Sequence, residues 1–288
     1  MSAERLSEQL EQSVLKRIAE DSLVLPTLPA VVTKALEVLK DPEVSFKQVG
    51  VIIERDPVLA ARLLRSATSA AFSAGTKKVS LPEALTRLGA KSVRAILVEA
   101  TAQKVFLSRD PKISDSMKRL WQHSVAVGTL ARDVLALSGN ADSEAAYLAG
   151  LLHDVGKPVV ASILLEFERQ VTEVYNRPFI DSAEWISVIG RTHRPVGVAL
   201  AEKWQMPEQV TRCIRECVEY DNADRASLVN IVCFSNSLAK KTGIYAGTID
   251  ADEVDALVMI GRSIIGANDE IIKTLTRGLK ERVSGLYD

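Results

Sequence analysis

Residues 149–157 read AGLLHDVGK, and this stretch carries the strongest local signals in the chain. Its apolar run predicts a buried helix, and Gly156 followed by Pro158 predicts where that helix stops. His153 and Asp154 are adjacent near this end, so an imidazole and a carboxylate can both reach one point beside the helix terminus. Elsewhere helix signals recur from end to end, while the alternating pattern of strands is nearly absent. The sequence therefore predicts an all-α fold.

The chain has three histidines, and the other two also lie in helical, apolar surroundings. His123 shares a helix face with Leu120, Val127 and Leu130, which turns its side chain inward. His193 lies in IGRTHRPVGVALAEKW, before a second glycine-containing apolar stretch. We expect all three to be candidates for one internal cluster. The alternative for His123 is a hydrogen-bonded core residue without a ligand.

Imidazole and carboxylate groups together suit manganese, iron, zinc or magnesium, and such an ion can activate water or polarise a phosphoryl oxygen. Lys157 would then steer phosphate, or else be an ordinary solvated lysine at a helix end. The cysteines Cys213, Cys217 and Cys233 form neither an even framework nor a CxxC pair, which suits a reducing cytoplasm. For them a buried apolar role is favoured over a redox or metal role.

Composition narrows the classes of partner. The 288 residues include 36 basic and 37 acidic side chains, for a net charge of -1. Phosphate neutralisation needs an excess of Lys and Arg, so we expect no obvious nucleic-acid partner. The uncharged run 145–152 is about half the length that crosses a bilayer, and the N-terminus lacks the pattern of a secretory signal. We therefore expect a cytoplasmic protein without a membrane partner.

Several segments together resemble a known family. WQHSVAVG, AGLLHDVGK, RTHRPVG and AEKWQMPEQV are similar to the HD superfamily of metal-dependent phosphohydrolases. Further N-terminal segments, among them LPTLPAVVTKALEVLKDPEVSFKQVGVIIERDPVLAARLLRSATSAAF and SLPEALTRLGAKSVRAILV, extend the resemblance to the HDOD family. This resemblance implies two packed helical subdomains, the second an HD-like helical bundle, used in bacterial signal transduction.

The expected organisation has four parts. Residues 1–22 form an amphipathic helix, 23–112 the N-terminal HDOD subdomain, 113–245 the HD-like subdomain, and 246–288 C-terminal helices packed on the body. The first helix has an apolar stripe of Leu6, Leu10, Val14 and Ile18. This stripe would pack on its own domain, or serve as a connector or as the seam of a homodimer.

The resemblance also implies a metal site and its ligands. His123, His153 and Asp154 match the first three ligands. The pattern then expects an aspartate, where this chain has Asn236. An amide oxygen is neutral and binds metal more weakly than a carboxylate. In relatives that hold two ions, His193 would serve the second.

The further histidines that the pattern expects after PEQVTRCI are replaced by CVEYD. Glu219 and Asp221 could substitute as oxygen ligands. With ligands missing, the set is expected to be a degenerate metal site, and no cofactor is expected unless a divalent ion such as manganese, iron, zinc or magnesium occupies it.

Three functions follow. The first is a non-catalytic signalling or regulatory module of the HDOD type, such as a response-regulator output, acting through a signalling protein or receiver domain. The second is a metal-dependent phosphohydrolase acting on a nucleotide or cyclic dinucleotide. The third is a module that binds a small ligand in the cleft between the two subdomains without reacting it.

Overall fold

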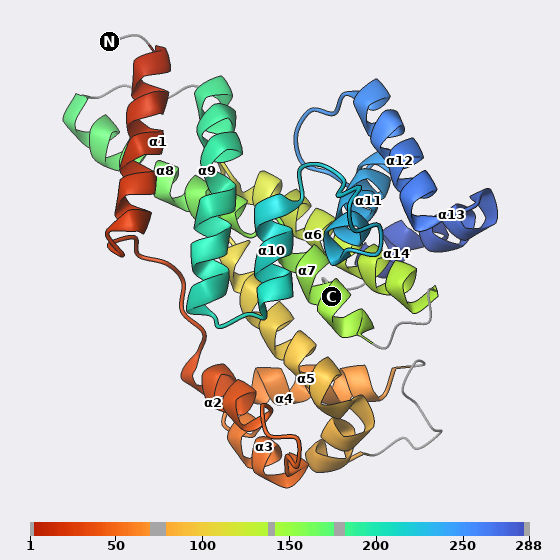
Figure 1. The fold of residues 1–288 in the computed structure, drawn as a ribbon. Helices are drawn as coiled ribbons and strands as arrows, with labels where there is room; N and C mark the ends of the chain where they lie inside the picture. The colour runs from red at the N-terminus through yellow and green to blue at the C-terminus, as the bar shows by residue number, and fades with distance from the viewer. Residues whose placement is uncertain (1–2, 70–78, 138–141, 176–181, 285–288) are drawn as a thin grey trace. The chain divides into compact units, whose positions relative to one another are not determined.

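The computed structural model describes residues 3–69, 79–137, 142–175 and 182–284, and Figure 1 shows the arrangement. Within these ranges every regular element is a helix, from α1 to α14. The prediction of an all-α protein is therefore confirmed.

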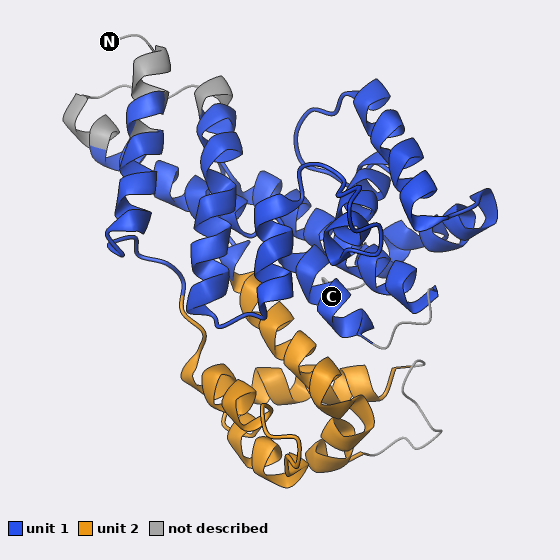
Figure 2. Ribbon diagram, in the orientation of Figure 1, with its two compact units in different colours: residues 1–26, 105–288 blue, residues 27–104 orange. Residues whose placement is uncertain are grey.

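The chain divides into two compact units, coloured separately in Figure 2. One unit comprises residues 27–104, and the other comprises 1–26 together with 105–288. The division falls eight residues before the sequence-based boundary after 112, and it places the first helix in the same unit as the C-terminal helices. The finer four-part organisation stays a prediction.

The described residues of the smaller unit form the helices α2 (Ala30–Val38), α3 (Phe46–Ile53), α4 (Pro57–Ala67) and α5 (Leu81–Val105), the last residue of α5 lying just beyond the unit. The Asp56 carboxylate accepts hydrogen bonds from the backbone N–H groups of Val58 and Leu59, which caps α4 as the Asp-Pro pair predicts. Gly89 has a φ of 75°, a backbone conformation that only glycine adopts easily. It joins the two helical segments that make up α5.

The larger unit carries the candidate site. Its helices are α1 (Ala3–Ala19), α6 (Ser114–Leu137), α7 (Ser143–Leu152), α8 (Gly156–Tyr175), α9 (Ser182–Lys203), α10 (Glu208–Glu216), α11 (Leu228–Lys241), α12 (Ala251–Ile265), α13 (Asp269–Thr276) and α14 (Leu279–Ser284). Helix α11 packs on α6, α7, α10 and α12, and α9 packs on α1, α8 and α10.

Helices α6 and α7 approach each other backbone to backbone. A Cβ atom on Gly150 would lie 2.8 Å from the Cα and the backbone nitrogen of Gly128, closer than real Cβ atoms come to other atoms. Side chains therefore cannot separate the two helices at this point.

The stretch around His153 corrects the sequence-based boundary. Helix α7 ends at Leu152, and residues 153–155 form a turn. Gly156 and Pro158 begin α8 instead of stopping α7, because proline is tolerated in a first helical turn, where its missing N–H is not needed.

One segment, residues 143–170, which covers α7, the turn and most of α8, is long and apolar enough to cross a membrane, but 78% of its most apolar window is buried inside the structure. Its position in the protein core accounts for its apolar character.

Helix α1 packs on α9 within its own unit. Val14 is buried, and Arg191 of α9 forms an ion pair with Glu11 at 2.7 Å. The side chains of Leu6 and Leu10 lie outside the described residues. Of the expected stripe, Val14 therefore packs inside the larger unit.

Candidate functional site

Two helices and a turn bring the predicted residues together. His123 lies in α6, His153 and Asp154 in the turn between α7 and α8, and His193 in α9. The Nε2 atoms of His153 and His123 lie 3.3 and 4.0 Å from Asp154 Oδ2, and His193 Nε2 lies 3.7 Å from Asp154 Oδ1. Asp154 is therefore the centre of the cluster.

A hydrogen bond to a backbone carbonyl oxygen orients each histidine ring. His123 Nδ1 lies 2.8 Å from the carbonyl oxygen of Ile244, and His153 Nδ1 lies 2.7 Å from that of Gly150. His193 Nδ1 lies 2.9 Å from the carbonyl oxygen of Ile189. A carbonyl oxygen can only accept, so the proton sits on Nδ1 in every case. Each Nε2 atom is thereby turned toward Asp154, as in histidines that bind metals.

Burial keeps two of the histidines neutral. Desolvation, together with the neighbouring His153, lowers the pKa of His123 to about 3. Desolvation lowers the pKa of His193 to about 4, although the nearby Asp154 opposes the shift. Neutral imidazoles with free Nε2 lone pairs are the form that binds a metal ion.

Lys157, at the start of α8, supplies a positive charge. Its Nζ donates to Asp154 Oδ2 at 2.5 Å. Burial alone would raise the pKa of Asp154, but His153 and Lys157 together hold it well below the ordinary value. In turn, Asp154 raises the pKa of Lys157 against the opposing effect of burial. The pair is a partly buried salt bridge in which each charge depends on the other.

Buried atoms that lack a hydrogen-bond partner indicate whether this cluster fits a metal ion. His123 Nε2 and His153 Nε2 are buried and have no hydrogen-bond partner in the part of the chain that the structure describes, and neither has Asn236 Oδ1. One donor atom from each of His123, His153 and Asp154 lies within 4.8 Å of the others. Unpaired buried acceptors are costly unless a ligand satisfies them. The residues therefore fit one divalent ion.

The other residues considered as ligands lie on α11 and in the segment after α10. Asn236 lies on α11, which packs on α6 and α7. The carboxylate of Asp221 accepts hydrogen bonds from the backbone of Ala223 and Asp224 and from Arg212. Glu219 is exposed. Neither carboxylate belongs to the group of donor atoms from His123, His153 and Asp154 that lie within 4.8 Å of one another.

Some contributors to the site were not predicted from the sequence. Tyr245 lies edge-on to His123, with ring centroids 5.1 Å apart, and the ammonium groups of Lys157 and Lys240 lie 5.8 and 5.0 Å from its ring centroid. Ile244 contributes only its carbonyl oxygen, which any residue carries. Neither contribution has a sequence pattern that could have identified it.

A glycine sets the distance between two parts of the cluster. A Cβ atom on Gly156 would overlap the carbonyl oxygen of His193, and one on Gly197 would press on Ile214. Helices α8 and α9 therefore meet closely beside Asp154.

The side chains of the cluster are enclosed. The exposed fractions are 0% for His123, 1% for His153, 3% for Asp154 and 7% for His193.

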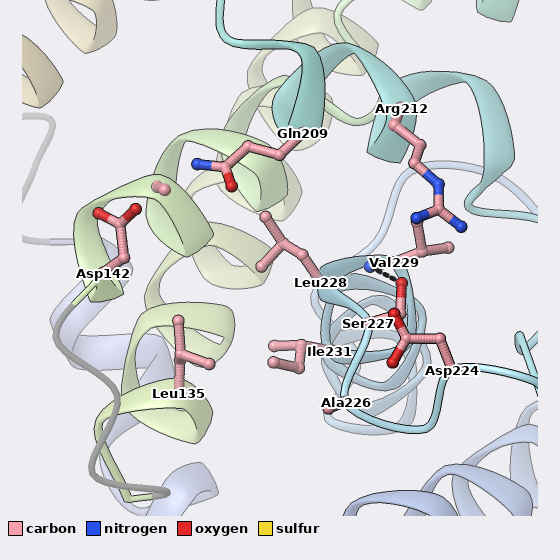
Figure 3. Close-up of a pocket in the computed structure, with 11 residues that line it drawn as sticks. Leu135, Asp142, Gln209, Arg212, Asp224, Ala226, Ser227, Leu228, Val229 and Ile231 are labelled. Carbon is pink, nitrogen blue, oxygen red and sulfur yellow. Dashed lines mark hydrogen bonds between the residues drawn. The ribbon is translucent and has the colours of Figure 1, made fainter.

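A separate cavity of about 300 Å³ lies in the same unit. Figure 3 shows residues that line it, among them Gln209 and Arg212 of α10, Asp224 and Ser227 before α11, and Leu228 at the start of α11. None of the four cluster residues lines this cavity.

A family model described as the HDOD domain matches residues 25–220. The chain belongs to the HDOD domain family. An uncharacterized protein of Treponema pallidum (strain Nichols) is 27% identical over 235 residues, which cover 79% of this chain and 44% of that protein. The chain thus spans less than half the length of this relative.

Solved structures share the fold. A protein of Shewanella amazonensis SB2B, named as a candidate metal-dependent phosphohydrolase, has a TM-score of 0.72 at 24% identity and covers 98% of this chain and 100% of its own. An HDOD domain protein of unknown function from Geobacter sulfurreducens has a TM-score of 0.66 at 23% identity, covering 96% of both chains. A candidate signal transduction protein of Marinobacter aquaeolei VT8 has a TM-score of 0.64 at 23% identity, covering 99% of this chain and 66% of its own. At these identities the likeness concerns the HDOD fold alone.

Proposed function

We propose that this HDOD protein is a non-catalytic signal transduction module that acts through protein partners. The observation that carries the proposal is the salt bridge between Lys157 and Asp154 inside an enclosed cluster. A hydrolase needs its central carboxylate for the metal and an opening for the substrate. Here a lysine of the chain itself pairs with that carboxylate, and no more than 7% of any cluster residue is exposed.

The degenerate ligand set supports the same proposal. Asn236 stands where the HD pattern has an aspartate, and Asp221 is used by a turn and by Arg212. One carboxylate and neutral ligands bind a divalent ion more weakly than two carboxylates would. Signalling HDOD modules would keep the fold while losing such ligands.

Metal content and turnover test the proposal together. Protein purified without chelators is analysed for manganese, iron, zinc and magnesium, and is assayed on cyclic dinucleotides with added manganese. We expect less than stoichiometric metal and no turnover beyond that of an Asp154→Ala control. Stoichiometric metal together with hydrolysis that Asp154→Ala abolishes would overturn the proposal.

A second function, metal-dependent phosphohydrolysis of a nucleotide or cyclic dinucleotide, is favoured by the unpaired Nε2 atoms of His123 and His153. These atoms, with the Asp154 carboxylate and the Asn236 amide oxygen, would hold one ion. When bound, that ion would supply Lewis acidity and a more acidic water. Lys157 would first have to leave Asp154, after which its ammonium could face a phosphate.

The partner that we propose is a receiver domain or another signalling protein in the cytoplasm, with the chain as a response-regulator output. A homodimer is the other assembly to test. Sedimentation of the full chain over a concentration series, alone and with an isolated receiver domain, distinguishes the two.

A further inference from the structure

Two cysteines from different helices meet in the larger unit. Cys217 follows the last residue of α10, and Cys233 lies in the middle of α11. Their Sγ atoms are 3.3 Å apart, and both thiols are free. A disulfide holds its sulfurs at about 2.05 Å, so the two atoms need to approach by little more than about 1 Å.

Local structure favours reaction at Cys217. It has a φ of -71° and a ψ of 64°, so the helix has ended there, and the next residue, Val218, is exposed. Helix ends open locally at low free energy. The Cys233 thiol donates to Cys217 Sγ, and this hydrogen bond lowers the pKa of Cys217 to about 7.

The third cysteine is a built-in control. All three cysteines are buried. Burial raises the pKa of the thiol of Cys213, which lies one turn before Cys217, whereas the hydrogen bond from Cys233 lowers the pKa of Cys217. A thiol with a raised pKa reacts more slowly, because the thiolate is the nucleophile.

We infer that Cys217 and Cys233 are a modification site at which a low-molecular-weight disulfide forms an internal disulfide bond. The Cys217 thiolate attacks the reagent, RSSR, which releases one thiolate, RS⁻, and leaves a mixed disulfide on Cys217. The Cys233 sulfur then displaces the second RS⁻ and loses its proton. Overall, two protein thiols are oxidised by two electrons, and one RSSR becomes two RSH.

The bond would constrain a defined segment. It would link the end of α10 to α11 and close a loop over residues 218–232. This loop contains Asp224, Ser227 and Leu228, which line the cavity in Figure 3. The Cys217 carbonyl oxygen also accepts a hydrogen bond from Arg194, the residue after His193. Oxidation would therefore fix one wall of the cavity and the contact of α9 with α10.

Peptide mapping tests the inference directly, because trypsin separates the three cysteines into CIR (213–215), ECVEYDNADR (216–225) and ASLVNIVCFSNSLAK (226–240). The native full chain is reduced, incubated with glutathione disulfide, alkylated and digested. We expect a single cross-linked species that joins the second and third peptides, is lighter than their sum by two hydrogens, and disappears after reduction. The monomer fraction should contain it.

Cys213→Ser should keep the cross-link, whereas Cys217→Ser and Cys233→Ser should each abolish it. A sample oxidised in urea confirms that the reagent is active. The inference is overturned if the native chain keeps three alkylated peptides at a reagent concentration that oxidises the urea sample. A cross-link that involves Cys213, or that joins two chains, would overturn it as well.

Discussion

Lys157 Nζ lies 2.5 Å from Asp154 Oδ2, the same carboxylate oxygen that faces the Nε2 atoms of His123 and His153. A metal ion bound by the two histidines would take the Asp154 carboxylate as its third ligand. The lysine and the ion would therefore compete for this carboxylate. The charge of Asp154 is balanced within the chain, three residues further on, at the first turn of α8.

Asp154→Asn should destabilise the protein by about 3 kcal/mol, because it leaves the Lys157 ammonium partly buried without its counter-charge. Urea unfolding at neutral pH measures this. Asp255→Asn is the matched control, because Asp255 pairs with Lys241 at 2.7 Å on the surface with 62% of its side chain exposed. There we expect a loss of no more than about 1 kcal/mol. Equal losses for the two variants would contradict a special role for the buried pair.

Lys157→Met should increase the affinity of the cluster for a divalent ion. The variant frees Asp154 Oδ2 and leaves its negative charge without a partner, while the methionine keeps most of the side-chain volume. Without metal we expect a lower melting temperature than in the unmodified chain, and added manganese or zinc should raise it again. Thermal unfolding with and without metal measures the effect, since a ligand of the folded state raises its apparent stability.

Lys241→Met is the control for general metal effects, because Lys241 forms an exposed pair. If manganese shifts the melting temperature equally in Lys157→Met, Lys241→Met and the unmodified chain, the lysine and the ion do not compete.

Stability should fall as the pH drops below about 6.5 in the presence of a chelator. His123 and His193 have pKa values lowered to about 3 and about 4 in the folded protein. The unfolded chain takes up protons on these side chains near pH 6.5, where the folded chain does not, so acid favours unfolding. Each histidine should contribute a slope of about 1.4 kcal/mol per pH unit between pH 6.5 and its folded pKa.

Urea unfolding at pH 7, 6 and 5 checks the slope. His193→Gln should remove about half of it, because one titrating group is lost. A stability that stays constant from pH 7 to pH 5 would contradict the buried, neutral state of both histidines.

Gly156→Ala should destabilise the protein by about 3 kcal/mol, because the new methyl group overlaps the His193 carbonyl oxygen and forces α8 and α9 apart. Gly190→Ala is the control in α9, since a Cβ there meets nothing within 4 Å. It should be neutral or stabilise by about 0.5–1 kcal/mol, the usual gain of alanine over glycine in a helix. Chemical denaturation measures the free energy of unfolding of both variants. A small loss of stability in Gly156→Ala would mean that α8 and α9 can move apart to accommodate the methyl group.

Helical periodicity was sufficient to predict the fold class and to predict that His123 of α6 points inward. The boundary at Gly156 was wrong because glycine and proline are signals for both the end of one helix and the start of the next. Only the packing of α8 on α9 decides between these two roles.

The cluster of His123, His153, Asp154 and His193 was expected from the sequence, but its electrostatics were not. Lys157 had two sequence-based roles, and neither was a salt bridge with Asp154. The contact of Lys157 with Asp154 depends on how the first turn of α8 lies relative to the turn of residues 153–155. Likewise, the meeting of Cys217 and Cys233 depends on how α10 packs on α11, which residue spacing does not reveal.

The contact between Gly128 and Gly150 has a consequence for how a signal could reach the cluster. This backbone contact holds α6 close to α7, so His123 on α6 and His153, which directly follows α7, are tied to the same pair of helices. His193 and Asn236 are carried by α9 and α11, outside that glycine contact. We expect movement of α9 or α11 to change the distances from these two residues to the histidine pair.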